Sequence, residues 1–198
     1  DICVERGIKF IGPSAEVIRR MGDKTEARRS MIAAGVPVTP GTEGNVADIA
    51  EALSEGDRIG YPVMLKATNG GGGRGIRRCN SREELEQNFP RVISEATKAF
   101  GRADVFLEKC IVNPKHIEAQ ILGDSFGNVV HLFERDCSIQ RRNQKLIEIA
   151  PSPQLTPEQR AYIGDLSVRA AKAVGYENAG TVEFLLAEGE VYFMEMNT

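Results

Sequence analysis

The feature that most constrains this chain is the stretch YPVMLKATNGGGGRGI, which runs from Tyr61 to Ile76. An apolar run ends in a lone lysine, Lys66, and four consecutive glycines follow at positions 70–73. A lysine at the end of a buried strand, beside a loop of free backbone N–H groups, suits a polyanion such as a nucleotide phosphate chain. The stretch predicts a strand–glycine loop–strand hairpin whose tip could fold over phosphates.

Other interpretations of the glycine stretch are less consistent with its surroundings. Gly70, Gly72 and Gly75 match the G-x-G-x-x-G dinucleotide pattern, but that pattern requires a helix directly after the glycines. Residues 76–79 have a strand pattern instead, and no Gly-Lys-Ser/Thr of a P-loop follows. A flexible glycine linker stays open as the alternative.

Composition places the chain among ordinary globular proteins. Its 198 residues fit one large domain or two small ones, with 41% hydrophobic and 27% charged residues. The net charge of −3 gives no general affinity for nucleic acid. No apolar run approaches the roughly 18 residues of a membrane span. Four scattered cysteines without a C-x-x-C motif are typical of reduced thiols, so we expect a cytoplasmic protein with neither nucleic-acid nor membrane partners.

Hydrophobic periodicity predicts helices and strands throughout the chain. The expected helices are 14–22, 23–34, 45–55, 82–99 and 156–174. The expected strands are 8–11, 61–67, 75–79, 104–109, 116–121, 128–134 and two within 181–197. The strands between positions 61 and 109 should form a small open sheet with two helices.

Two polar segments lie near the centre of the chain. On strand 116–121, His116, Glu118 and Gln120 share one face, although such a face often simply points to water. The run RDCSIQRRNQK, residues 135–145, is basic and has little apolar support. We expect a loop there, either a solvated surface or a loop that faces an anion.

The last hairpin, TVEFLLAEGEVYFMEMN, carries one carboxylate in each apolar strand, Glu183 and Glu195. Buried carboxylates are costly unless they are paired with cations or metal. If residues 188–190 form the loop, Glu183 faces Glu195 and Asn197 lies on the same face. Two carboxylates and an amide oxygen make a hard oxygen site for Mg²⁺. A two-residue loop would put the glutamates on opposite faces, and a pair of surface glutamates is the alternative.

These parts could together hold a metal–nucleotide, with Lys24 as a second lysine beside a phosphate chain. Lys24 lies in the first turn of its helix, where a cation is unfavourable for the helix dipole, so a solvated lysine stays open. The chain resembles the central part of biotin carboxylase, an ATP-grasp enzyme found in acetyl-CoA, propionyl-CoA and pyruvate carboxylases. The matching motifs cover nearly the whole chain in order: FIGPSAEVIRRMGDK, YPVMLKATNGGGGRG, EKCIVNPKHIEAQ, ERDCSIQRRNQK and EFLLAEGEVYFMEMNT.

The resemblance implies an α+β fold of the ATP-grasp type, in which two α+β sub-domains grip ATP. Residues 1–22 would be the end of an N-terminal Rossmann-like domain with a linker helix, and 23–37 a further linker helix. Residues 38–110 would be the lid sub-domain with the Gly-rich loop, and 111–198 the truncated C-terminal sub-domain. The family's main catalytic arginine would follow Thr198, so we expect a piece of a longer enzyme that is inactive alone.

The resemblance also implies roles for the matching positions. Metal ligands for Mg²⁺ or Mn²⁺ would be Glu183, Glu195 and Asn197, and Lys145 would hold bicarbonate. ATP phosphates would be bound by Lys24, Lys66, Gly72 and Gly73, with Gln140 near them. Adenine would be read by Glu108, Lys109, Cys110 and Ile111, between the apolar residues Met64, Ile76, Leu185 and Met194. The remaining ATP contacts would be His116 and Asn143, which stands where many family members have a histidine that contacts ribose.

The reaction implied by the resemblance has two steps. ATP phosphorylates bicarbonate to carboxyphosphate, and its CO₂ passes to N1′ of biotin on a carrier protein or domain. The implied partners are the biotin carboxyl carrier, a carboxyltransferase and a second copy in a homodimer, in fatty acid biosynthesis or pyruvate carboxylation. Two alternatives stay open, another ATP-grasp ligase such as a carbamoyl-phosphate synthase half, and a non-catalytic nucleotide-binding module.

Overall fold

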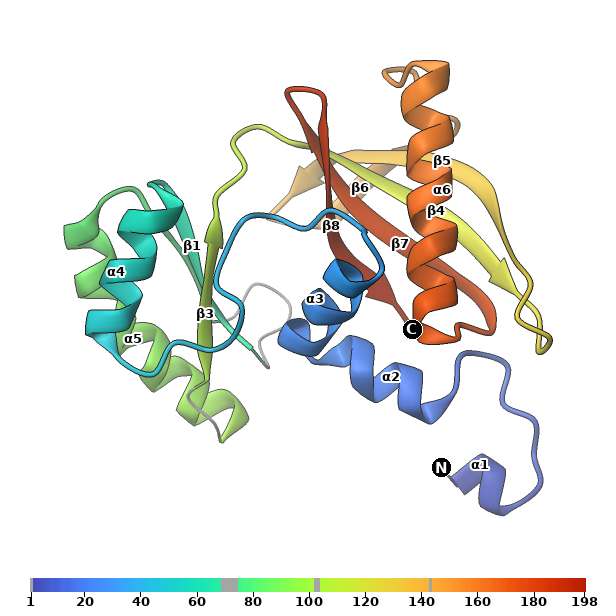
Figure 1. Ribbon diagram of the computed structural model, residues 1–198, viewed down its shortest axis with the longest axis horizontal. Coiled ribbons are helices and arrows are strands. Elements are labelled where there is room, and N and C mark those ends of the chain that lie inside the picture. The colour runs from blue at the N-terminus through green and yellow to red at the C-terminus, as the bar shows by residue number, and fades with distance from the viewer. Residues whose placement is uncertain (1, 69–74, 102–103, 143) are drawn as a thin grey trace. The chain divides into compact units, whose positions relative to one another are not determined.

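The computed structural model describes residues 2–68, 75–101, 104–142 and 144–198. The chain forms two compact units (Figure 1). The larger unit contains residues 1–22, 26–38 and 113–198, and the smaller unit contains residues 23–25 and 39–112. Each unit has a hydrophobic core of its own. The sub-domain boundaries expected from the sequence stay a prediction.

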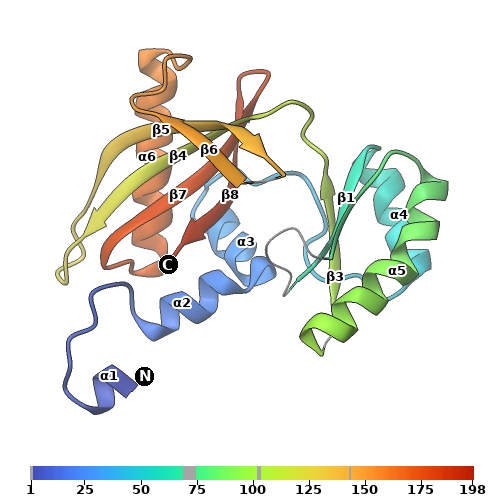
Figure 2. The ribbon, with the colours of Figure 1, turned by 180° about the vertical axis from the view of Figure 1, so that it is seen from behind.

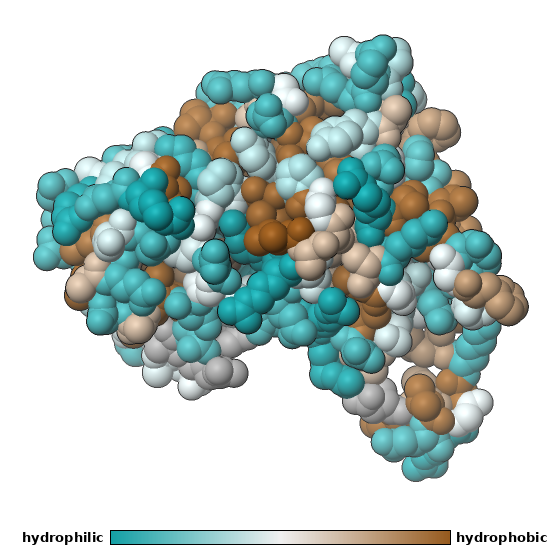
Figure 3. Space-filling model, viewed as in Figure 1, coloured by the Kyte–Doolittle hydropathy of each residue, from teal (hydrophilic) through white to brown (hydrophobic). Residues whose placement is uncertain are grey.

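The smaller unit is a three-stranded antiparallel sheet in the order β2-β1-β3, covered by two helices. Its elements are α4 (Ile49–Ile59), β1 (Val63–Ala67), β2 (Ile76–Cys79), α5 (Arg82–Phe100) and β3 (Val105–Lys109). Because strand residues alternate between faces, Val63 and Leu65 are buried under the helices while Lys66 lies on the opposite face. On the face shown in Figure 3, the described surface of the smaller unit is largely hydrophilic (teal), with some brown, hydrophobic residues between.

The helix predicted at 45–55 begins and ends later than expected. Asp48 is the N-cap of α4, and its side chain accepts a hydrogen bond from the backbone N–H of Glu51 at 2.9 Å. The side-chain oxygen of Asn45 instead accepts from the hydroxyls of Thr25 (3.3 Å) and Thr68 (2.6 Å). Asn and Asp are both favourable N-cap residues, so the local sequence does not distinguish Asn45 from Asp48. The predicted start was wrong because Asn45 bonds to residues distant in sequence instead.

The larger unit is built on a five-stranded antiparallel sheet in the order β6-β5-β4-β7-β8. Its strands are β4 (Lys115–Gly123), β5 (Val129–Arg141), β6 (Gln144–Ile149), β7 (Asn178–Ala187) and β8 (Glu190–Asn197). The helices are α1 (Ile2–Glu5), α2 (Ala15–Gly22), α3 (Lys24–Ala33), whose first two residues belong to the smaller unit, and α6 (Pro157–Val174). None of the helices in the described part of the chain is long and apolar enough to cross a membrane.

One face of the five-stranded sheet packs on α6, and the opposite face carries polar side chains. Ile117 and Ile121 of β4 share a core cluster with Leu166 of α6. Since neighbouring strand residues point to opposite faces, His116 and Glu118 project from the other face. That face is turned to the viewer in Figure 2, with α6 behind the strands.

The local signals around α6 act as the sequence predicts. Thr156 and Gln159 form a reciprocal capping box at its start, and Gly175 ends it in the left-handed conformation. Ser14 likewise caps α2, accepting a hydrogen bond from the N–H of Val17 at 3.2 Å. Helix ends set by neighbours in sequence are therefore readable without the tertiary structure.

The short strand predicted at 8–11 is wrong. Residues 8–11 form no strand, and the side chains of Ile8, Phe10 and Ile11 are exposed. A strand must pair its backbone groups with a neighbour, and no strand in the described chain pairs with this segment. An apolar run therefore does not form a strand unless another strand lies beside it to pair with its backbone.

The basic run 135–145 is mostly strand rather than the predicted loop. β5 continues to Arg141, and β6 begins at Gln144. The ladder between them shifts near Asp136 and again at Ile139. Such bulges interrupt the apolar–polar alternation by which a strand is recognised, which explains the wrong prediction.

The turn of the last hairpin also differs from the prediction. The loop is the two residues Glu188 and Gly189, not 188–190, and Ala187 pairs with Glu190. Both loop residues have positive φ, 52° and 87°. Two consecutive positive φ values are those of the tight type I′ turns that suit the strand twist of hairpins.

A β-bulge nevertheless restores the predicted pairing of the carboxylates. Phe184 pairs with Phe193, and the next pair is Glu183 with Glu195, so Met194 is an extra residue on β8. A regular ladder from a two-residue turn would put the glutamates on opposite faces. The predicted pairing is confirmed, although the predicted reason for it, a three-residue loop, was wrong.

Candidate functional site

Three glutamates lie in a row across neighbouring strands of the larger unit. Glu118 on β4 pairs directly with Glu183 on β7, which pairs directly with Glu195 on β8. Glu118 is only 4% exposed and Glu183 only 3%. Like charges that face each other across strands are unfavourable, and more so when buried, unless cations lie between them. The row therefore requires cations.

Lys145 supplies the cation for the first pair. Its Nζ donates to Oε1 of Glu183 at 2.7 Å and also to Oε2 of Glu118. Burial alone would lower the pKa of Lys145, but its hydrogen bonds to the two carboxylates raise that pKa well above its usual value. The ammonium group thus stays charged and bridges Glu118 and Glu183.

Glu183 is bound by two further donors. Asn197 Nδ2 donates to Oε1 at 2.6 Å, and His116 Nε2 contacts Oε2. Burial by itself would raise the pKa of Glu183, but hydrogen bonds from His116, Lys145 and Asn197 outweigh it and hold the pKa at about 2. The carboxylate is therefore ionised at neutral pH.

Among the described residues, no cation lies between the carboxylates of the second pair in the row, Glu183 and Glu195. Within the described residues, the Glu195 carboxylate makes no hydrogen bond or ion pair, and its side chain is half-buried. Asn197 donates to Glu183 and to Thr181 Oγ1 at 2.8 Å through its amide nitrogen. Two carboxylates and an amide oxygen are the hard ligands that Mg²⁺ and Mn²⁺ prefer, so this donor set fits a divalent cation.

His116 and Gln140 form a second polar layer beside Glu183. Gln140 Nε2 donates to His116 Nδ1 at 2.8 Å and to the carbonyl of Cys137 at 2.9 Å. Since Nδ1 accepts from Gln140, Nε2 is the ring nitrogen that can donate to Glu183. The backbone N–H of His116 donates to Ser138 Oγ at 3.0 Å, which fixes the strand beneath the ring.

The smaller unit brings together Lys66 and the end of β3. Lys66 forms an ion pair with Glu108 on the face opposite the helices. Lys109 turns away from that pair and donates to the carbonyls of Gly60 (2.9 Å) and Tyr61 (3.0 Å). Lys66 thus has an anionic partner that a ligand phosphate would have to replace or share.

The residues after β3 differ in their backbone contacts. The N–H of Cys110 donates to the carbonyl of Pro62 at 3.0 Å, and the Cys110 side chain is buried. The N–H of Ile111 makes no hydrogen bond within the described part of the chain. A backbone donor left open at the end of a strand is available to an acceptor such as an adenine nitrogen.

Other predicted phosphate and ribose contacts are less fully placed. Lys24 is the first residue of α3, and its side chain is half-buried. Gly72, Gly73 and Asn143 lie outside the described residues. Their predicted contacts stay predictions.

Comparison with known proteins identifies the family. The family model described as "Carbamoyl-phosphate synthase L chain, ATP binding domain" matches residues 23–198. The chain belongs to this family. It is 60% identical over 198 residues to the 2-oxoglutarate carboxylase small subunit of Hydrogenobacter thermophilus, covering 100% of this chain and 42% of the relative. The chain therefore spans less than half the length of that relative.

Solved structures of this ATP-binding family agree with the fold. The biotin carboxylase domain of Hydrogenobacter thermophilus 2-oxoglutarate carboxylase, a dimer in complex with MgADP, ADP and bicarbonate, has a TM-score of 0.93 at 60% identity. Biotin carboxylase from Campylobacter jejuni, in a βγ-ATP complex, has a TM-score of 0.95 at 50% identity. Each match covers 100% of this chain and 44% of the solved chain. The predicted α+β ATP-grasp fold and the resemblance to biotin carboxylase are confirmed.

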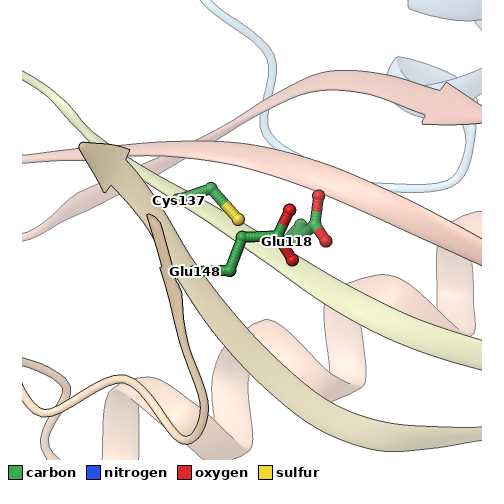
Figure 4. A group of neighbouring side chains, drawn as sticks. All are labelled: Glu118, Cys137 and Glu148. Carbon is green, nitrogen blue, oxygen red and sulfur yellow. The ribbon is translucent and has the colours of Figure 1, made fainter. Parts of the chain in front are cut away.

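A second acidic group in this ATP-grasp chain does not have the properties of a metal site. Figure 4 shows the sulfur of Cys137 beside the carboxylates of Glu118 and Glu148, with ligand atoms all within 4.8 Å of one another. The pKa of the Cys137 thiol is raised to about 12, mainly by burial and secondarily by the charge of Glu118. The thiolate, which is the form that binds metals, is therefore absent at neutral pH. Glu118 is already neutralised by Lys145 and Arg135.

No role was predicted from the sequence for Glu118 or Arg135 of this family member. The available signal was the alternation on strand 116–121, which places Glu118 on the face of His116. The sequence does not show that β4 pairs with β7. That pairing places Glu118 opposite Glu183, which is 65 positions away in the sequence. Arg135 fell within the basic run that was predicted to be a loop.

Proposed function

We propose that this chain is the MgATP- and bicarbonate-binding core of a biotin carboxylase. The observation that carries the proposal is the facing pair Glu183 and Glu195, two carboxylates on one sheet face between which the described part of the chain places no cation. The solved relatives whose complexes hold MgADP and bicarbonate support the choice of ligands. A Mg²⁺ or Mn²⁺ ion would be held by Glu183, Glu195 and Asn197.

In the proposed reaction, an oxygen of bicarbonate attacks the γ-phosphorus of ATP and the bond to the β–γ bridging oxygen breaks, releasing ADP. Carboxyphosphate then breaks down to CO₂ and phosphate. N1′ of biotin bonds to the CO₂ carbon, and the N1′ proton passes to the phosphate. The divalent cation supplies charge neutralisation for the phosphates, the main requirement in phosphoryl transfer.

The cationic and hydrogen-bonding residues of this chain would bind the anionic substrates. Lys145, already cationic between two carboxylates, would hold the bicarbonate anion. Lys24 and Lys66, with the N–H groups of Gly72 and Gly73, would bind the phosphates. Further ATP contacts would come from His116, Gln140, Asn143 and the segment Glu108, Lys109, Cys110 and Ile111, where the open N–H of Ile111 suits adenine.

The whole protein would work with further partners in the cytoplasm. We propose a biotin carboxyl carrier, a carboxyltransferase and a second copy of the chain, as in the dimer of the solved relative. Cys79, Cys110 and Cys137 are buried free thiols, which is typical of a reducing compartment.

The second candidate is another ATP-grasp ligase, such as a carbamoyl-phosphate synthase half. The name of the matching family model favours this second candidate. The 50–60% sequence identity of the chain to carboxylases favours a biotin carboxylase instead. Biotin-dependent cleavage of ATP separates them, because a carbamoyl-phosphate synthase would instead require ammonia or glutamine. A non-catalytic nucleotide-binding module would show metal-dependent ATP binding without either activity.

The experiment is calorimetric titration of ATP into the complete protein, with Mg²⁺ and with EDTA. Binding should require Mg²⁺, and Glu195→Gln should weaken it at least roughly tenfold because one metal-binding carboxylate is lost. The matched control is Glu190→Gln, an exposed glutamate at the start of the same strand, which should bind as the wild type does. Equal binding in EDTA, or by Glu195→Gln, would contradict the proposal.

A further inference from the structure

Arg135 occupies the far side of Glu118 from Lys145. Its Nε donates to Oε1 of Glu118 at 2.6 Å, and its Nη2 contacts the same oxygen. Lys145 binds the other oxygen, Oε2. The two cations therefore divide the buried carboxylate between them, one oxygen each.

Gln120 fixes the orientation of Arg135. The Gln120 side-chain oxygen accepts from Nη1 of Arg135 at 3.1 Å, while its amide nitrogen donates to the carbonyl of Gly180 at 2.8 Å. The bond to Gly180, on the neighbouring strand β7, leaves only the amide oxygen to face the guanidinium. Arg135 also lies 3.7 Å from the carboxylate of Glu148. Its planar fork is thus held on several sides, a geometry that lysine cannot reproduce.

We infer that Arg135 is a positioning residue for Lys145, acting through Glu118 and oriented by Gln120. With one oxygen of Glu118 taken by Arg135, the ammonium of Lys145 stays between Glu118 and Glu183. Without Arg135, Lys145 is the one cation left in contact with the buried Glu118 among the described residues, and both oxygens of Glu118 draw it away from Glu183. The inference rests on the proposed function for its consequence, the holding of bicarbonate by Lys145.

A second arginine–glutamate pair of the same unit provides the matched control. Arg160 donates to the buried Glu134 at 2.8 Å, much as Arg135 does to Glu118. Glu134 bonds to the backbone N–H of Ser152 and has no contact with Lys145. Loss of Arg160 leaves a buried carboxylate without its cation but leaves the surroundings of Lys145 unchanged.

The test compares Arg135→Met and Arg160→Met in the complete enzyme by steady-state kinetics. Arg135→Met should raise KM for bicarbonate roughly tenfold, with KM for ATP changed less than about twofold. Arg135→Lys, which keeps the charge and loses the fork, should lie between Arg135→Met and the wild type. Gln120→Leu should shift KM for bicarbonate in the same direction by less. Arg160→Met should leave both KM values near those of the wild type, whatever its effect on stability.

A crystal structure of Arg135→Met without ligands tests the positioning independently of activity. The ammonium of Lys145 should lie on Glu118 and lose its contact with Glu183. A Lys145 that still contacts both carboxylates overturns the inference, as does an unchanged KM for bicarbonate. If Arg135→Met does not fold, Arg135→Lys is compared in the same two ways. A wild-type enzyme without bicarbonate-dependent ATP cleavage contradicts the proposed function instead, and the crystal structure then decides the positioning alone.

Discussion

Among single residues, Glu183 is the one on which the polar contacts of the larger unit converge. One of its oxygens accepts from Lys145 and Asn197, and the other meets His116. A buried carboxylate with this many donors is stabilised only while it is ionised. Both the stability of the chain and its response to pH should therefore depend on this side chain.

The pH dependence follows from the depressed pKa of Glu183, about 2 against an ordinary value of 4.5. Its contribution to stability is present above the unfolded-state pKa and is lost as pH falls from about 4.5 towards 2, up to about 3 kcal/mol in all. Urea unfolding of the metal-free protein at pH 7, 5, 4 and 3 measures the loss. Glu183→Gln should show a shallower decline over that window, and the exposed Glu190→Gln the same decline as the wild type. Equal slopes for all three proteins would contradict the assignment.

Removal of Lys145 should destabilise the chain through the charges it leaves behind. Lys145→Met leaves the buried Glu118 and Glu183 facing each other without their bridging cation, at a cost of roughly 3 kcal/mol. Lys9→Met removes an exposed lysine and should change the unfolding free energy by less than about 0.5 kcal/mol. Denaturant unfolding at neutral pH and low salt measures both. A Lys145→Met variant as stable as Lys9→Met would show that the carboxylates are not held in opposition.

Among the elements, the hairpin of β7 and β8 matters most, because its two-residue turn and its bulge together decide which face Glu195 occupies. The turn places Glu188, a residue with a Cβ, at a φ of 52° beside Gly189 at 87°. Left-handed backbone is costly for ordinary residues and free for glycine. The bulge at Met194 then moves the remainder of β8 by one residue.

Substitutions in the turn should act through backbone conformation alone. A Cβ added at Gly189 or at Gly22 meets no atom within 4 Å, but only Gly189 has a positive φ. Gly189→Ala should therefore cost about 1–2 kcal/mol, while Gly22→Ala, at the end of a helix, should be neutral or stabilising. Glu188→Gly should gain a few tenths to about 1 kcal/mol by relieving the positive φ. Thermal unfolding measures all three, and equal effects of the two alanine variants would contradict the turn geometry.

For the whole molecule, the division into two cores predicts local responses to core mutations. Leu107 is fully buried in the smaller unit, and Leu166 is fully buried in the larger unit. Truncation of either to alanine should cost about 2–5 kcal/mol through lost burial and a cavity. Hydrogen exchange followed by mass spectrometry should show faster exchange mainly in β1–β3 for Leu107→Ala, and mainly in β4–β8 for Leu166→Ala. Uniformly faster exchange in both variants would show a single cooperative unit.

The local features of this chain were readable from its sequence. The caps of α6 and α2, and the carboxylate in each strand of the last hairpin, depend on residues a few positions apart. The motifs also identified the ATP-grasp family, because its characteristic side chains are spread over the whole sequence in order. Helix caps and strand alternation depend on residues close together in the sequence, so they can be predicted without knowing the fold.

The tertiary structure decided the rest, because it depends on which strands meet. The bulge at Met194 rescued a pairing that the actual turn would have destroyed, and no short-range signal marks it in so apolar a strand. Glu118, Lys145 and Glu183 come together only through the order β6-β5-β4-β7-β8. A charge in a sequence carries no information on its partners. Because Glu118 and Glu183 are buried, they require cationic partners. The strand order determined that Lys145 is the partner that bridges them.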